Sequence, residues 1–440
     1  MSPLAMGGIG FAVLMAMLAI RIPIGVAMIA VGMGGFALVV GVTPLMNVLK
    51  TQMFYQYLNY DLSVIPLFLL MGQFAAKAGL SQALFRATNT WIGHYRGGIA
   101  MAAIGGCAGF GAIAGSSLAT AATMGQVALP ELRRHNYSPA LATGTLAAGG
   151  TLGILIPPSV VLIIAAILIE ANIEVMFQAA FLPGLLAVAG YMAAIAVVVR
   201  LDPESGPAGD PASGREKWLA FLDIWPVIAI FLLVIGGIYF GFFTPTQGAS
   251  VGAVGTGLVA LTKGGMRTDG FVDSVLGAAR SSALIFLILF GASMLNSFLG
   301  FTRLPMVIAA AISDSGFPPM VVLLAMVLIF LVLGMFMDSL SMILLFLPIF
   351  WPIMIELDFG LDIDDLRIWF GIITLMVVEI GLITPPIGLN VFVINSMAGD
   401  VPMKETFRGV MPFLMTDGVR VIILIAFPSI TLVLPALLRG

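Results

Sequence analysis

The chain has 440 residues, of which 60% are hydrophobic and only 9% are charged. Soluble domains carry roughly 25% charged residues, so this composition excludes a soluble protein. One helical crossing of a bilayer needs about 20 apolar residues, which leaves room for about a dozen membrane segments and little else. We therefore expect an all-α polytopic membrane protein, in contact with lipid, that is not an enzyme.

Several kinds of chemistry are excluded by the scarcity of single residue types. The lone cysteine, Cys107, excludes an intrachain disulfide and an all-cysteine metal site. The two histidines, His94 and His135, lie beside basic residues and give no haem-ligand pair. No phosphate-binding GxxxxGK[ST] loop occurs. We expect no organic cofactor, no nucleic-acid partner and no ATP hydrolysis by this chain.

Apolar runs between charged or turn residues predict the membrane segments. The stretches 98–132 and 319–355 are longer than one crossing, so each is predicted to be a hairpin that leaves by the face it entered. Pro-Pro pairs interrupt the stretches 140–169 and 368–397, which predicts two broken helices. The other predicted spans are 4–20, 24–42, 62–76, 176–199, 224–243, 246–262, 281–299 and 410–436.

Basic residues indicate the orientation, because Lys and Arg gather in cytoplasmic loops. With the segment between 76 and 98 placed inside, 14 of the 19 basic residues lie on the cytoplasmic side. The acidic run 356–365 then lies outside. This alternation holds only if both predicted hairpins return to the face they entered.

The chain also contains an internal repeat. The glycine and proline pair of 153–158 recur with the same spacing in 381–386, and each follows a predicted hairpin and a short amphipathic stretch, 80–93 or 302–316. The charges place the amphipathic stretches on opposite faces, so the repeats are predicted to be inverted. Paired broken helices in inverted repeats are typical of secondary transporters, with substrate and ion sites at the breaks. The predicted units are N-terminal scaffold helices 1–61, first repeat 62–200, cytoplasmic linker 201–222, scaffold helices 223–280, second repeat 281–409 and C-terminal helix 410–440.

The predicted hairpin tips carry small and polar residues. We expect the tip region of the first hairpin over 105–120, where glycines permit close backbone approach and hydroxyls face a ligand. The alternative is that these small residues only let helices pack closely. In the second hairpin an acid lies within an apolar run, either as a cation ligand or as a helix cap. The tip candidates are Gly115, Ser116, Ser117, Thr120, Asp338, Ser339 and Ser341.

The breaks supply the remaining candidates. Prolines remove backbone donors and unwind the helix, so nearby carbonyls become available to a sodium-sized ion. A plain kink is the alternative, and Glu379 could pair with an arginine that the sequence does not identify. Asp417 and Arg420, spaced i and i+3, are interpreted as a structural pair. The break candidates are Gly153, Pro157, Pro158, Glu379, Gly381, Thr384, Pro385, Pro386 and Asn390.

Six short motifs together resemble the large membrane subunit of tripartite ATP-independent periplasmic (TRAP) transporters. They span nearly the whole chain, and one position departs from the pattern, because Gln247 stands where the family leads us to expect Glu. The motifs are Val64-Ile65-Pro66-Leu67-Phe68, Gly115-Ser116-Ser117, Ile156-Pro157-Pro158-Ser159, Leu182-Pro183-Gly184, Phe243-Thr244-Pro245-Thr246 and the stretch 379–390.

The resemblance implies a mechanism and partners. It implies an elevator-type, sodium-coupled symporter of a bacterial inner membrane, in which a transport domain with both hairpins and both breaks moves against a scaffold. A separate four-helix membrane subunit and a periplasmic binding protein that delivers a carboxylate or sulfonate are the implied partners. A stand-alone ion-coupled anion symporter or exchanger, and a channel, remain the alternatives. The sodium candidates are Ser116, Gly153, Asp338 and Thr384.

Overall fold

The computed structural model describes residues 2–263, 266, 268–314 and 316–439. These residues form helices and no strand, which confirms the all-α prediction. Four helical stretches are long and apolar enough to cross a membrane: Ile173–Leu201, Gly214–Tyr239, Thr268–Thr302 and Met403–Ala426. Two bent helix pairs also meet this criterion, and several shorter apolar helices accompany them.

The order of elements repeats along the chain. In each half a helix leads into a short amphipathic helix, a helical hairpin, a broken helix and a further long helix. The first set is α4 (Val64–Lys77), α5 (Leu80–Ile92), α6 (Gly98–Ala114), α7 (Ser117–Arg134), α8 (Pro139–Leu155), α9 (Val160–Leu168) and α10 (Ile173–Leu201). The second set is α14 (Thr268–Thr302), α15 (Leu304–Asp314), α16 (Pro319–Gly334), α17 (Ser339–Ile355), α18 (Ile363–Gly381), α19 (Leu389–Ala398) and α20 (Met403–Ala426).

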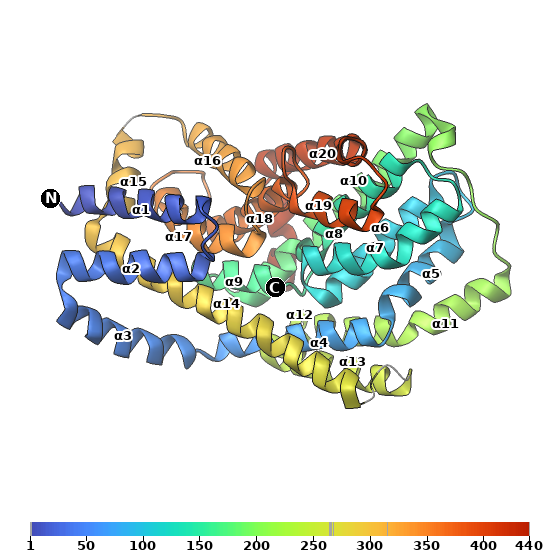
Figure 1. The fold of residues 1–440 in the computed structure, drawn as a ribbon, viewed down its shortest axis with the longest axis horizontal. Helices are drawn as coiled ribbons and strands as arrows, with labels where there is room; N and C mark the ends of the chain where they lie inside the picture. Colours follow the sequence, from blue (N-terminus) through green and yellow to red (C-terminus); the bar gives the residue numbers. More distant parts are fainter. Residues whose placement is uncertain (1, 264–265, 267, 315, 440) are drawn as a thin grey trace.

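The remaining helices flank these two sets. The long helix α14 packs against α2 and α4, and α13 packs against α4, along one side of the molecule (Figure 1). Close approach depends on small residues, because a Cβ on Gly32 would lie 2.6 Å from the backbone nitrogen of Leu295. The flanking elements are α1 (Pro3–Ala19), α2 (Ile24–Val40), α3 (Val42–Tyr57), η1 (Tyr60–Ser63), η2 (Pro203–Ser205), α11 (Gly214–Phe231), η3 (Leu232–Gly236), α12 (Gly237–Tyr239), α13 (Pro245–Thr262) and α21 (Ser429–Arg439).

Both predicted hairpins form. Helix α6 packs against α7, and α16 packs against α17. In the first hairpin the chain turns at Gly115, whose φ of +61° favours glycine, and restarts at the N-cap Ser116. The tip is shorter than predicted, because Gly105, Gly106, Gly109 and Gly111 lie inside α6. There they allow α6 to pack closely against neighbouring helices, which is the packing alternative.

Both helix breaks form at the Pro-Pro pairs, and both Pro-Pro peptide bonds are cis. The axes of α8 and α9 differ by 49°. The short helix after each break packs on the opposite repeat: α9 contacts α17 and α18, and α19 contacts α7 and α8. Because each short helix packs on the opposite repeat, the hairpins and broken helices of the two repeats form one packed unit.

All five predicted boundaries fall within helices, including 61/62 in η1, 200/201 in α10 and 222/223 in α11. A capping box formed by Ser213 and Glu216 starts α11 at Gly214, inside the predicted linker 201–222. The divisions at 280/281 and 409/410 lie inside α14 and α20. The non-helical part of the predicted linker is fixed by backbone bonds, because the Gly206 carbonyl accepts from Gly97 N–H at 2.9 Å.

Two helices differ from the predicted spans. Helix α3 was not predicted, because polar residues around Lys50 lower the apolar signal of 42–57. The predicted span 410–436 is divided, since Pro428 ends α20 and α21 follows it. Pro428 has no N–H for the carbonyl of Leu424, which instead accepts a hydrogen bond from Trp369 Nε1 at 2.9 Å.

Candidate functional site

The second helix of each hairpin begins in the same way. Ser116 caps α7 by accepting from the Ala119 N–H at 3.4 Å. Asp338 caps α17, where its Oδ2 accepts from the Ser341 N–H at 3.1 Å and its Oδ1 accepts from the Ser341 hydroxyl at 2.5 Å. Each cap is followed directly by a buried serine. The capping interpretation of Asp338 is therefore correct, and its half-buried side chain retains acceptor capacity for a cation.

A single carboxylate joins the two hairpin tips. Glu379, in the last turn of α18, is 1% exposed. Its Oε2 accepts a hydrogen bond from the Ser117 hydroxyl, and its Oε1 accepts from the Ser339 hydroxyl at 2.8 Å. The described partners of Glu379 are thus serines from both repeats. The hydrogen-bond partners of Glu379 are therefore these two hydroxyls and not an arginine.

Glycine pairs bring each hairpin against its own broken helix. A Cβ on Gly111 would lie 2.6 Å from the Cα of Gly153, and a Cβ on Gly381 would lie 2.6 Å from the Cα of Gly334. The predicted repeat glycines, Gly153 and Gly381, are therefore equivalent in space as well as in sequence. Any side chain at these positions would separate the hairpin from the break.

Beside Gly153, buried oxygens lack partners. The Oγ1 of Thr120 is fully buried without a described hydrogen-bond partner, and a Cβ on Gly153 would lie 2.5 Å from it. The Oδ1 of Asn390 is also buried without a partner, while its Nδ2 donates to the Ala147 carbonyl at 3.3 Å. A Cβ on Gly150, one turn from Gly153, would lie 3.0 Å from that Nδ2. Thr120 Oγ1 and the Asn390 side chain therefore lie beside the same face of α8.

At the second break, the carbonyls freed by the prolines accept hydrogen bonds from nearby backbone N–H groups, which the first break does not show among the described residues. The Gly381 carbonyl accepts from Thr384 N–H at 3.1 Å, and the Leu382 carbonyl accepts from Asn390 N–H at 3.1 Å. The Thr384 hydroxyl donates to the Ile380 carbonyl at 2.6 Å, which leaves its lone pairs available. The prolines of this break are partly exposed, whereas Pro157 and Pro158 are buried.

A buried polar network lies in the same body. Arg420 and Asp417 form the predicted pair at 2.8 Å, and both side chains are almost fully buried. Sequence reasoning missed the two hydroxyls that extend this pair. The Tyr191 hydroxyl donates to Asp417 Oδ2 at 2.8 Å, and Thr151 Oγ1 lies 2.9 Å from the Tyr191 oxygen. The network connects α8, α10 and α20 behind the first break.

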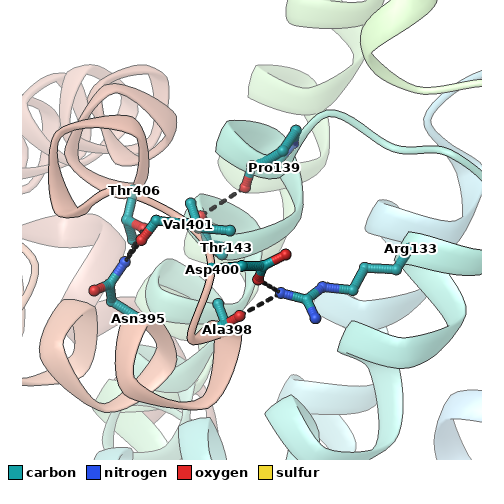
Figure 2. Close-up of polar contacts among 8 residues, drawn as sticks. All are labelled: Arg133, Pro139, Thr143, Asn395, Ala398, Asp400, Val401 and Thr406. Atoms are coloured by element: carbon teal, nitrogen blue, oxygen red, sulfur yellow. Dashed lines mark hydrogen bonds and ion pairs between the residues drawn. The ribbon is translucent and has the colours of Figure 1, made fainter.

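The repeats also meet beyond α19 (Figure 2). Arg133, at the end of α7, forms an ion pair with Asp400 and donates to the Ala398 carbonyl at 2.5 Å. On the other side of this turn, Asn395 Nδ2 donates to the Val401 carbonyl at 2.8 Å. These contacts fix the turn between α19 and α20 against the first hairpin.

The position that departs from the family pattern has a structural explanation. Gln247 Oε1 accepts from Thr244 N–H at 3.0 Å, and Gln247 N–H donates to Thr244 Oγ1 at 3.3 Å. This capping box at the start of α13 works with either Gln or Glu. The substitution therefore lies outside the hairpins and preserves the local geometry.

The comparisons with known proteins agree with this architecture. Residues 11–430 match the family model described as "Tripartite ATP-independent periplasmic transporter, DctM component". The C4-dicarboxylate TRAP transporter large permease protein DctM of Pseudomonas aeruginosa is 37% identical over 88% of this chain and 89% of its own length. The sialic acid TRAP transporter large permease protein SiaM of Vibrio cholerae is 29% identical over 95% of this chain and 96% of its own length.

A solved structure shares the fold. The YdaH transporter of Alcanivorax borkumensis, described as having an unusual topology, matches with a TM-score of 0.59 and 13% identity, over 88% of this chain and 89% of that one. These two relatives are named as permeases rather than enzymes. The chain therefore belongs to the DctM-component family of tripartite ATP-independent periplasmic transporters, as an integral large permease subunit of the inner membrane.

Proposed function

We propose that this chain carries a small organic anion into the cell together with sodium ions. The observation that supports this most directly is the meeting of both hairpin tips and both helix breaks in one body, with buried acceptor oxygens between them. Thr120 Oγ1 and Asn390 Oδ1 lack described partners. Leaving a buried polar atom unpaired costs about 1–3 kcal/mol, and a cation bound beside the first break would give these oxygens a partner.

The first break offers carbonyl oxygens that suit a sodium ion. Pro157 and Pro158 have no N–H, so they remove the donors that a continuous helix would offer to the carbonyls of Gly153 and Ile154. Unwound carbonyls of this kind coordinate sodium in transporters with broken helices. Ser116 and Gly153 would serve a first ion, and Asp338 and Thr384 a second ion near the other break.

The anion is assigned to a helix N-terminus. First-turn N–H groups favour negative charge. The neutral cap Ser116 leaves the α7 end to the substrate, whereas the Asp338 carboxylate already caps α17. The names of the two relatives, a C4-dicarboxylate and a sialic acid permease, favour a substrate with a carboxylate. A sulfonate presents similar anionic oxygens and belongs to the same proposed class.

The proposed transporter has two further parts. The family description is tripartite, which supports a small four-helix membrane subunit and a periplasmic protein that delivers the substrate. The proposed motion is of the elevator type. In it, the body that contains α6–α9 and α16–α19 moves against a scaffold that includes α2, α13 and α14.

The test is uptake by proteoliposomes that contain this chain, its membrane partner and its binding protein. We expect accumulation of labelled succinate or sialic acid that requires an inward sodium gradient and the binding protein. Uptake by this chain alone would favour the stand-alone symporter. Uptake that follows a proton gradient in potassium buffer would contradict sodium coupling, and passive sodium-independent flux would indicate a channel.

A further inference from the structure

The hydrogen bonds of Glu379 connect two places that are otherwise far apart in the sequence. Ser117 is the first residue of α7 and Ser339 is the first residue of α17, so they occupy equivalent positions in the two hairpins. Each binds a different oxygen of the same carboxylate. All three side chains are buried, with exposures of 1%, 5% and 1% for Ser117, Ser339 and Glu379.

The count of protons decides what these serines can bind. A serine hydroxyl has one proton and two acceptor lone pairs, and an ionised carboxylate only accepts. When Glu379 is ionised, both hydroxyls donate to it and neither has a proton left for an anionic substrate. Each serine oxygen can only present lone pairs on its other side, and lone pairs suit a cation.

The carboxylate is also held in place from both sides. Negative charge near a helix N-terminus is stabilised by the helix dipole, and Glu379 lies beside the first residues of α7 and α17 together. An ordered tip would fix the carboxylate, and the fixed carboxylate would then order the hydroxyl of the other tip. Conformational order that one ligand has established makes binding of a second ligand more favourable.

We propose that Glu379 is a positioning residue that couples the two hairpin tips, so that sodium binding at one tip favours sodium binding at the other. Its oxygens hold the Ser117 and Ser339 hydroxyls with their lone pairs turned toward the ions and away from the substrate. This inference rests on the proposed sodium-coupled function. It adds that the two ion sites are linked by one side chain.

The conservative substitution Glu379→Gln breaks the symmetry with little change in volume. A glutamine side chain still accepts from one serine through its carbonyl oxygen, but its NH₂ donates to the other. That second serine then loses a lone pair to the amide, and its proton turns toward the ion site. We expect one sodium site to be lost or severely weakened while the other remains.

The experiment measures equilibrium binding of radioactive sodium to the purified transporter, with choline chloride holding the ionic strength constant. We expect cooperative binding by the native protein, with a Hill coefficient above one. In Glu379→Gln the coefficient falls to one, and half-saturation moves to about tenfold higher sodium, within the range of about 5–150-fold for allosteric coupling. Ser117→Ala and Ser339→Ala should each weaken binding at both sites.

Thr374→Val is the matched control, because Thr374 is equally buried in α18 and touches neither hairpin serine through a described hydrogen bond. We expect it to bind sodium cooperatively. If Glu379→Gln misfolds, the two serine variants and their double variant still measure the coupling. A double variant with strictly additive effects would overturn the inference.

Sodium-coupled transport and the role of Glu379 are contradicted by different results. Absence of sodium binding by the native protein would contradict the proposed function itself. If Glu379→Gln still binds sodium cooperatively, only the role of Glu379 is contradicted. The same holds if the native protein binds sodium cooperatively only when substrate is present. A shift in succinate affinity at saturating sodium, with unchanged sodium binding, would assign the serines to the substrate instead.

Discussion

The two repeats use the same elements but differ in how the break is satisfied. The first break is buried throughout, has the neutral cap Ser116 at its hairpin tip and leaves Thr120 Oγ1 without a described partner. The second is partly exposed, carries the acid Asp338 at its hairpin tip and returns its freed carbonyls to local N–H groups. The first site therefore depends on backbone geometry, while the second depends on a charged side chain.

The proline pairs give the largest expected effect. In Pro157→Ala with Pro158→Ala, two new N–H groups can donate to the Gly153 and Ile154 carbonyls, each bond contributing about 1 kcal/mol. The oxygens proposed for sodium are then withdrawn, and we expect sodium-driven uptake to fall by more than about tenfold, since about 1.4 kcal/mol is one factor of ten. Uptake in proteoliposomes at saturating substrate is the measurement.

The same change in the second break should matter less. Thr384 and Asn390 N–H groups already satisfy the carbonyls that Pro385→Ala with Pro386→Ala would compete for. We expect a partial loss of transport. Pro130→Ala is the control, because this exposed proline lies inside α7 away from both breaks. Equal losses of uptake in the two double variants would show that the two breaks contribute equally to transport.

Glycine substitutions separate packing from ion binding. The Cβ of Gly153→Ala would lie 2.6 Å from the Ser116 carbonyl oxygen and would displace it together with Thr120 Oγ1. The Cβ of Gly381→Ala would meet the Gly334 backbone, which holds no proposed ligand. We expect both to lose about 1–3 kcal/mol of stability through overpacking, and the first also to lose sodium affinity. Thermal denaturation with and without sodium measures both effects.

Gly300→Ala provides the reference for these variants. A Cβ at Gly300 would meet nothing within 4 Å. Because alanine favours a helix over glycine by about 1 kcal/mol, this variant should be neutral or slightly stabilised, with unchanged sodium dependence. Similar sodium affinities in Gly153→Ala and Gly381→Ala would place the ion away from the first break.

Substitutions of Asp338 separate the cap from the charge. Asparagine caps a helix about as well as aspartate, whereas alanine costs about 1 kcal/mol of cap stability. We expect Asp338→Asn to keep the native melting temperature but to need several times more sodium for half-maximal uptake, and Asp338→Ala to lose both. An Asp338→Asn transporter with native sodium dependence would leave the cap as the only role of Asp338.

The parts of the fold that were predictable have local causes. Two adjacent prolines interrupt a helix, as they do at Pro157-Pro158 and Pro385-Pro386. The hairpins follow from apolar stretches that are longer than one membrane crossing. The partners of Glu379 were not predictable, because Ser117 lies 262 residues away and Ser339 lies 40 residues away along the chain. Such contacts depend on the packing of α9 and α19 against the opposite repeats, and no local sequence pattern indicates that packing.

Other differences arose from competing local signals. The Pro- and Gly-rich segment after α10 predicted a linker. In the structure its Gly209 N–H donates to the Gly93 carbonyl, and its Ser205 carbonyl accepts from the Ser138 N–H. Ser205 is buried as a result. Polar composition therefore marked the break in α-helix between α10 and α11, but composition does not show whether tertiary hydrogen bonds fix that segment in place.

The smallest expected effect concerns the junction in Figure 2, where the repeats meet beyond the breaks. Arg133→Ala removes an ion pair to Asp400 whose side chains are 44% and 75% exposed, and such pairs contribute about 0–1 kcal/mol. It also removes the bond to the Ala398 carbonyl at the end of α19. We expect a small fall in melting temperature and a slight slowing of uptake, with native sodium dependence. Arg134→Ala, whose side chain is 77% exposed and pairs only locally with Glu131, should change neither. Loss of sodium coupling in Arg133→Ala would show that this junction, and not the breaks alone, sets the geometry of the ion sites.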